Sequence, residues 1–126
     1  MNAMARAIAA LFACVVPVFP GVAAQPAEIF GRWATDPGDC ADNRYVWVFA
    51  EDRAALVIAN TPLSGWRRPA YEPGEGPAIA VIFVGPPQRK IAWRIIKDGE
   101  IAAVSHLEDG RVVDQRSFQT WKRCAN

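Results

Sequence analysis

Few residues in this chain of 126 amino acids are suited to nucleophilic or acid–base chemistry. His106 is the single histidine, and the serines are Ser64, Ser105 and Ser117. Ser105 and His106 are neighbours in a segment with strand periodicity, so their side chains point to opposite faces and cannot form a nucleophile–base pair. The same periodicity places His106 on the more polar face together with Glu100, which predicts a surface position. We predict no catalytic residue, although a Ser-His-Asp unit using Ser64 or Ser117 stays as an alternative.

Metal-binding patterns are also sparse. A zinc enzyme needs several histidine or cysteine ligands, and one histidine with widely separated cysteines does not supply them. Asp36, Asp39 and Asp42 recur at every third position, and calcium favours several carboxylates on one flexible loop. Their spacing matches no EF-hand, however, and the Pro37-Gly38 pair explains the segment as a polar turn. We therefore predict neither a metal nor a cofactor.

Aromatic and cationic side chains gather in the long irregular stretch from Thr61 to Gly76. It contains Trp66, Arg67, Arg68 and Tyr71 among three prolines and three glycines. Tryptophan, tyrosine and arginine are enriched at binding hot spots, and a loop of this length in a small domain is often functional. We predict that this loop and the adjacent open end of the fold form the binding surface. The structural alternative is that Trp66 folds back as a lid over the core.

The elements that must position these residues are strands. Apolar residues recur with a period near two in 45–50 and 90–95. Asp98-Gly99 and Asp109-Gly110 are two-residue hairpin signals that separate further strand segments. Ala78 to Val84 is apolar on both faces, so it must be covered on both sides.

The pattern predicts an all-β fold. We expect an antiparallel meander of about seven to eight strands, from a first strand at Ile29 to Thr35 to a last strand at Arg111 to Trp121. Helical structure is limited to one turn around Pro26 to Ile29. With no helical layer, such a sheet hides its edges as a closed or partly open barrel, or alternatively as a small β-sandwich.

Residues 1–24 have the composition of a bacterial Sec-type signal peptide. Arg6 is the only charge in this segment, Ala7 to Phe19 is apolar, and Val22-Ala23-Ala24 offers small residues for the signal peptidase. The segment is too short and too often interrupted by proline to span a bilayer permanently. We predict that it is removed, which leaves a single β domain of residues 25–126 in the periplasm or outside the cell.

A lipoprotein is the alternative to simple cleavage after Ala24. Leu11-Phe12-Ala13-Cys14 resembles a lipoprotein box, which would place a lipid on Cys14. Phe12 is bulky for its position in such a box, and an apolar tail would then follow the modified cysteine. Cleavage after Ala24 is therefore the favoured hypothesis.

Two cysteines, Cys40 and Cys124, remain in the mature domain and predict one disulfide in an oxidising compartment. Closing a loop of 84 residues restricts the unfolded chain by about 4 to 5 kcal/mol on the entropy model. With seven strands, both cysteines lie at one rim of the meander. An eighth strand within Thr61 to Gly76 would separate them unless a loop reaches across.

The charge balance excludes two classes of partner. The chain has 14 Lys and Arg against 13 Asp and Glu, and loss of Arg6 with the signal leaves 13 of each sign. Neutrality without a basic run argues against a nucleic-acid partner, which requires a cationic surface. It also argues against attraction to an anionic membrane, so we expect no stable membrane anchor after signal cleavage.

Gly31-Arg32-Trp33 resembles the Gly-x-Trp signature of lipocalin-like β-barrels, with Gly31 and Trp33 as the signature residues. Small periplasmic protease inhibitors of the Inh type share the signal peptide, this signature and a single disulfide. The resemblance covers residues 30–40, and the second cysteine at the end of the chain departs from it. It implies that Trp33 closes one barrel end beneath a basic residue, Arg116 or Arg123, in a cation–π contact. The simpler interpretation is a buried tryptophan at a strand entry.

These features predict an exported, non-catalytic β domain that binds a protein or a small apolar ligand. A periplasmic inhibitor of a secreted protease or lysozyme is the more specific alternative, and it follows from the Inh-type resemblance. A small hydrolytic enzyme and a component of an envelope assembly are the remaining alternatives. The last of these would use Ala78 to Val84 or the Trp66 loop as an apolar contact.

Overall fold

A computed structural model describes residues 24–113 and 119–125 of the protein. Within them the fold is all-β and antiparallel, as the alternation predicts. The predicted signal peptide lies outside the described residues, apart from Ala24. The strands are β1 (Gly31–Ala34), β2 (Tyr45–Phe49), β3 (Ala54–Ile58), β4 (Thr61–Pro62), β5 (Ala70–Pro73), β6 (Ala78–Phe83), β7 (Arg89–Lys97), β8 (Glu100–Glu108), β9 (Arg111–Val112) and β10 (Thr120–Arg123).

Helical structure is limited to two short 3-10 helices, η1 (Pro26–Ile29) and η2 (Pro37–Asp39). The first is the helical turn that the sequence predicts. It contains Ile29, so the first strand begins at Gly31 and is shorter than expected. No helix among the described residues is long and apolar enough to cross a membrane.

The ten strands form one sheet in the order β4-β3-β2-β1-β10-β8-β7-β6-β5, with β9 paired to β8. The first and last strands are neighbours in the middle of the sheet, where Trp33 pairs with Arg123. The edge strands β4 and β5 do not pair with each other, so the sheet is not closed into a barrel. Near this opening, Ala54 and Arg67 form an isolated bridge.

The structure has more strands than the predicted seven to eight because Thr61 to Gly76, which was expected to be irregular, contributes two of them. This stretch contains β4 and β5. Both strands lie at sheet edges, where Pro62 and Pro73 are tolerated because an edge strand can leave one side without a hydrogen-bond donor. The predicted strand at 111–121 includes β9 and the beginning of β10, and residues 114–118 between them lie outside the described residues.

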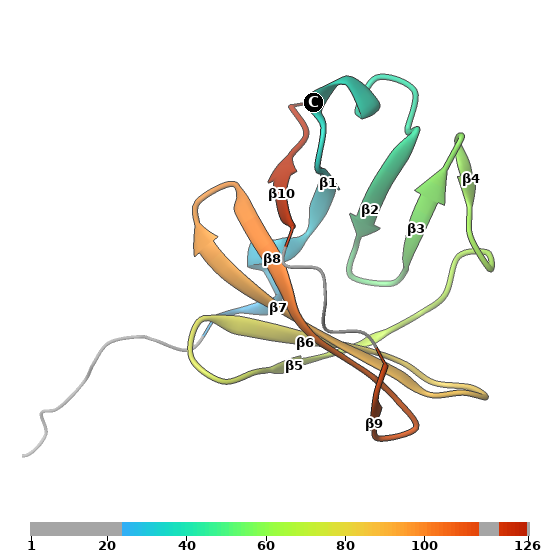
Figure 1. The fold of residues 1–126 in the computed structure, drawn as a ribbon, viewed down its shortest axis with the longest axis vertical. Helices are drawn as coiled ribbons and strands as arrows, with labels where there is room; N and C mark the ends of the chain where they lie inside the picture. Colours follow the sequence, from blue (N-terminus) through green and yellow to red (C-terminus); the bar gives the residue numbers. More distant parts are fainter. Residues whose placement is uncertain (1–23, 114–118, 126) are drawn as a thin grey trace, which may run out of the picture.

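The sheet folds over so that its two halves enclose a common core (Figure 1). The first half comprises β1–β4 and β10, and the second half comprises β5–β9. The fully or largely buried residues of this core come from both halves and include Trp33, Phe49, Ala54, Ile79, Val81, Phe83, Ile91, Trp93, Ile101 and Trp121.

β6 is buried at every position, as its unbroken apolar sequence predicts. It lies between β5 and β7 in the sheet, and Ile79, Val81 and Phe83 point into the core. Burial on both faces explains why the segment lacks the polar alternation of its neighbours.

Cys40 and Cys124 form a disulfide with a Cα–Cα distance of 5.7 Å. With ten strands and an antiparallel β1–β10 pair, the chain after β1 leads away from Cys124. The segment that contains η2 therefore folds back, and Arg32 holds it there by donating hydrogen bonds to the Cys40 carbonyl and to Asn43 Oδ1. The loop that reaches across is thus what joins the two cysteines.

Candidate functional site

A cavity of about 180 Å³ opens between the two halves of the sheet, close to the gap between the edge strands. Most of its lining is apolar, and the polar groups are two arginines, one serine and the single histidine. The lining residues are Trp47, Leu56, Leu63, Ser64, Arg67, Phe83, Arg89, Ile91 and His106.

The first half of the sheet supplies one apolar wall. Trp47 of β2 and Leu56 of β3 are cross-strand partners, so their side chains project from the same face toward the core. The Trp47 ring stacks on Phe49 at 5.4 Å and meets Trp93 edge-on at 5.7 Å between ring centroids. Leu63 stands at the mouth, where 55% of its surface is exposed.

The second half of the sheet supplies the opposite wall, again through cross-strand partners whose side chains project from the same face. Phe83 pairs with Arg89 across β6 and β7, and Ile91 pairs with His106 across β7 and β8. Each pair shares a face, and all four side chains line the cavity. The register of two hairpins therefore brings together residues that are far apart in sequence.

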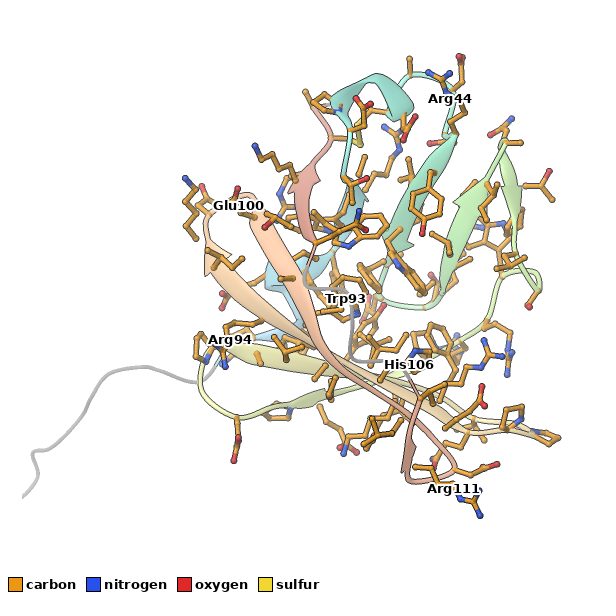
Figure 2. The ribbon with its side chains drawn as sticks, in the orientation of Figure 1. Arg44, Trp93, Arg94, Glu100, His106 and Arg111 are labelled. Atoms are coloured by element: carbon orange, nitrogen blue, oxygen red, sulfur yellow. A yellow bond between two sulfur atoms is a disulfide. The ribbon has the colours of Figure 1, made fainter. Side chains whose placement is uncertain are left out.

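His106 is not the surface residue that the alternation predicts. It is half-buried and lines the cavity, and its Nε2 atom is buried with no hydrogen-bond partner among the described residues. The register between β7 and β8 shifts after the Trp93–Ala103 pair, so that Ala92 faces Ser105 and Val104 is the extra residue. Such a bulge reverses the alternation along β8 and turns His106 inward. In Figure 2, His106 and Trp93 lie inside the fold, whereas Glu100 lies at its periphery.

Arg67 is held in place by hydrogen bonds from both its backbone and its guanidinium group. Its backbone N–H donates to the Ala54 carbonyl at 3.2 Å, and its carbonyl accepts from the Ala54 N–H at 2.8 Å. Its guanidinium Nη2 donates to the Val84 carbonyl at 2.6 Å. No carboxylate among the described residues pairs with it, whereas Arg89 forms an ion pair with Glu108 at 3.1 Å. The cavity therefore carries an excess of positive charge.

The four residues of the predicted binding loop do not all line the cavity. Only Arg67 lines the cavity. Trp66 is 41% exposed and lies under the guanidinium of Arg53 at 4.5 Å, so it is not a lid over the core. Arg68 is exposed and does not line the cavity.

Tyr71 belongs to β5 rather than to a loop and has a structural position. Its hydroxyl donates to the Ala50 carbonyl at 2.6 Å, and its ring contacts Phe30 edge-on at 5.3 Å. Burial raises the pKa of Tyr71 to about 12, and the nearby Asp52 carboxylate adds to this effect.

The Gly-x-Trp residues do not line the cavity, although Trp33 pairs across β1 and β2 with Trp47, which does. Trp33 is buried, donates from Nε1 to the Ile29 carbonyl at 2.9 Å, and carries the Arg123 guanidinium 4.3 Å above its ring. Arg123 also donates to the carbonyls of Phe30 and Glu28. Of the two basic residues that the resemblance offered, Arg123 makes the cation–π contact and Arg116 lies outside the described residues.

The aspartates around Cys40 form a turn. Asp36 accepts a hydrogen bond from the Gly38 N–H at 2.9 Å, and Asp39 forms an ion pair with Arg44 at 3.3 Å. Among the residues that the structure describes, no group of three or more His, Cys, Asp or Glu side chains is placed to hold a metal ion.

Comparison with known proteins finds no family model that matches this chain, and no curated protein or solved structure that is similar to it. The cavity and its lining are therefore the features that bear on function.

Proposed function

We propose that this protein is an exported, non-catalytic domain that binds a small, mainly apolar ligand in the cavity between the two halves of its sheet. The observation that carries the proposal is a cavity of about 180 Å³ with an apolar lining and an exposed apolar residue, Leu63, at its mouth. An apolar cavity of about 150 Å³ is large enough to bind benzene. The space thus suits a single aromatic ring or a short aliphatic chain.

A binding role agrees better with the polar groups than a hydrolytic role does. Ser64 and His106 both line the cavity, but no hydrogen bond joins them, and no carboxylate in the described part of the chain orients the histidine. A serine nucleophile requires a base within hydrogen-bond reach and a third group that orients the base. These requirements are not met by the described residues.

The binding test uses the protein exported from cells and a panel of one-ring and eight-carbon compounds. Calorimetry is expected to show saturable one-to-one binding of at least one of them, and the ligand should raise the melting temperature. Leu63→Trp is expected to fill the mouth and abolish binding. Ile96→Trp is the matched control, because Ile96 is 49% exposed and does not line the cavity. Absence of binding at millimolar concentration, or equal binding by wild type and Leu63→Trp, would reject the proposal.

Export to an oxidising compartment is the second part of the proposal. The Cys40–Cys124 disulfide supports it, because such bonds persist mainly outside the cytoplasm. N-terminal sequencing of protein from the periplasm or medium should give Gln25 as the first residue. A lipid-modified Cys14, or an intact Met1, would contradict cleavage after Ala24.

A further inference from the structure

We infer that the ligand of this cavity is a small organic monocarboxylate, with one aromatic ring or a chain of about eight carbons, whose head group binds to Arg67. This inference rests on the proposed binding function and specifies its ligand class. The charge of the lining, the fixed position of Arg67, and the separation of polar and apolar groups in the cavity support it.

The lining is cationic without a compensating acid. Arg67 and Arg89 are its two charged residues, and the described residues that line the cavity include no aspartate or glutamate. Glu108 lies outside the lining and neutralises Arg89. One positive charge, that of Arg67, is thus left without an ionic partner among the described residues. An anionic ligand would supply that partner, whereas a cationic ligand would be repelled.

The guanidinium group of Arg67 has unused donors and a fixed position, both of which favour binding of a carboxylate. A guanidinium has five N–H donors, and the only hydrogen bond of this side chain to a described residue is the one from Nη2 to the Val84 carbonyl. Donors therefore remain for a second acceptor, while the bond to Val84 and the backbone bridge to Ala54 fix the position of the group. Ordering costs on binding are reduced when the recognising group is already held in place.

Gly85 gives independent evidence that this position of Arg67 is built into the fold. A Cβ atom at residue 85 would lie only 2.9 Å from Arg67 Nη2. The backbone there has φ of +126°, which L side chains rarely adopt. A glycine at this point thus leaves room for the guanidinium beside the β6–β7 turn.

The polar and apolar parts of the cavity match the two ends of such a ligand. Trp47, Leu56, Phe83 and Ile91 provide apolar walls for a ring or chain. His106 adds a second polar side chain whose buried Nε2 has no partner in the described part of the protein. A neutral hydrocarbon would fill the walls but leave the charge of Arg67 unpaired, which favours a ligand with an acidic group.

The test compares three eight-carbon ligands that differ only in the head group: octanoate, 1-octanol and octylamine. For the wild-type protein we expect octanoate to bind at least about tenfold more tightly than octanol, and octylamine to bind most weakly. Arg67→Gln should reduce the affinity for octanoate to that for octanol. Arg68→Gln is the matched control, because it removes the same charge from an exposed position that does not line the cavity.

The outcomes separate this inference from the binding function on which it rests. Equal affinity for octanoate and octanol in wild type, or unchanged octanoate affinity in Arg67→Gln, would overturn the carboxylate assignment while octanol binding upholds the cavity. Failure of all three ligands, together with no effect of Leu63→Trp on the wider panel, would overturn the binding function itself. The wild-type comparison of head groups needs no variant, so it decides the matter even if Arg67→Gln folds poorly.

Discussion

Gly31 is a position where both the backbone conformation and a neighbouring side chain disfavour any residue other than glycine. Its φ is +137°, and a Cβ atom added there would lie 2.5 Å from Arg123 Nη1. The guanidinium occupies this place because it stacks on Trp33 and donates to the Phe30 and Glu28 carbonyls. The Gly-x-Trp pattern therefore has a local physical cause here, namely space for the cation over the indole ring.

Gly31→Ala is expected to reduce the free energy of unfolding by about 1 to 3 kcal/mol through backbone strain and the clash with Arg123. The clash disappears when Arg123 is shortened, so the same change should cost less in an Arg123→Ala background. Urea unfolding of the two single variants and the double variant measures this coupling. Strict additivity would show that the guanidinium is not what excludes a side chain at residue 31.

Tyr71 makes stability depend on pH in the alkaline range. Its pKa is raised from 10.0 to about 12, chiefly by burial. Above pH 10 the unfolded chain releases this proton while the folded protein keeps it, so stability falls as the pH rises from 10 toward 12. We expect Tyr71→Phe to remove part of this slope in urea unfolding between pH 9.5 and 11.5, with pH 8 as the reference. Identical slopes in the two proteins would contradict the raised pKa.

For single residues, the sequence could indicate which residue types are suited to binding, but not which other residues they contact in the fold. The composition of 61–76 drew attention to Arg67, which lines the cavity, and equally to Trp66, Arg68 and Tyr71, which do not. His106 was predicted on the wrong face because a single β-bulge at Val104 reverses the alternation of side chains along β8. The residue types in this segment do not indicate that a bulge is present.

Among the elements, the strands at the centre of the sheet were predictable and those at its edges were not. The apolar run of β6 and the alternation in β7 follow directly from burial on two faces and on one face. β4 and β5 contain prolines and few apolar residues, and they pair on one side only. Edge strands therefore have the composition of a loop, which explains why Thr61 to Gly76 was expected to be irregular.

The central role of β6 gives a direct test. Ile79 is 0% exposed and belongs to the core, so Ile79→Ala should lower the free energy of unfolding by about 2 to 5 kcal/mol through lost burial and the cavity left behind. Ile96→Ala on β7 removes the same atoms at a position that is 49% exposed, and we expect a change within about 0.5 kcal/mol. Comparable losses in the two variants, measured in urea, would contradict the assignment of β6 to the core.

The whole molecule is one sheet whose first and last strands meet in the middle and whose edges stay apart. The disulfide cross-links the chain where β1 and β10 pair. Cys124 directly follows β10, and the turn after β1 folds back to bring Cys40 beside Cys124. The sequence predicted which cysteines would pair, because only two lie outside the predicted signal peptide. It could not predict that the join requires a loop folded back by Arg32.

Loss of this cross-link is expected to destabilise the domain by about 2 to 5 kcal/mol, because an 84-residue separation is no longer closed in the unfolded chain. The double variant Cys40→Ser/Cys124→Ser should show this loss in urea unfolding, and reducing agent should lower the melting temperature of wild type but not of the variant. Equal stability of the variant and the oxidised wild type would show that the disulfide is not structural.

The cavity is a property of the whole molecule, and for that reason it was not predictable from the sequence. Trp47, Leu56, Phe83 and Ile91 come from four strands in the two halves of the sheet, and their alternation marks them only as inward-facing. Whether inward-facing side chains fill the space or leave a cavity depends on how far the halves are held apart at the unpaired edges.

Intermolecular nuclear Overhauser effects between octanoate and the protein test the central claim most directly. We predict contacts from the octanoate chain to the side chains of Trp47, Leu56 and Ile91, and a chemical-shift change at the Arg67 guanidinium that octanol does not produce. Contacts confined to exposed apolar residues such as Ile96, or an identical response of Arg67 to octanol, would contradict the account.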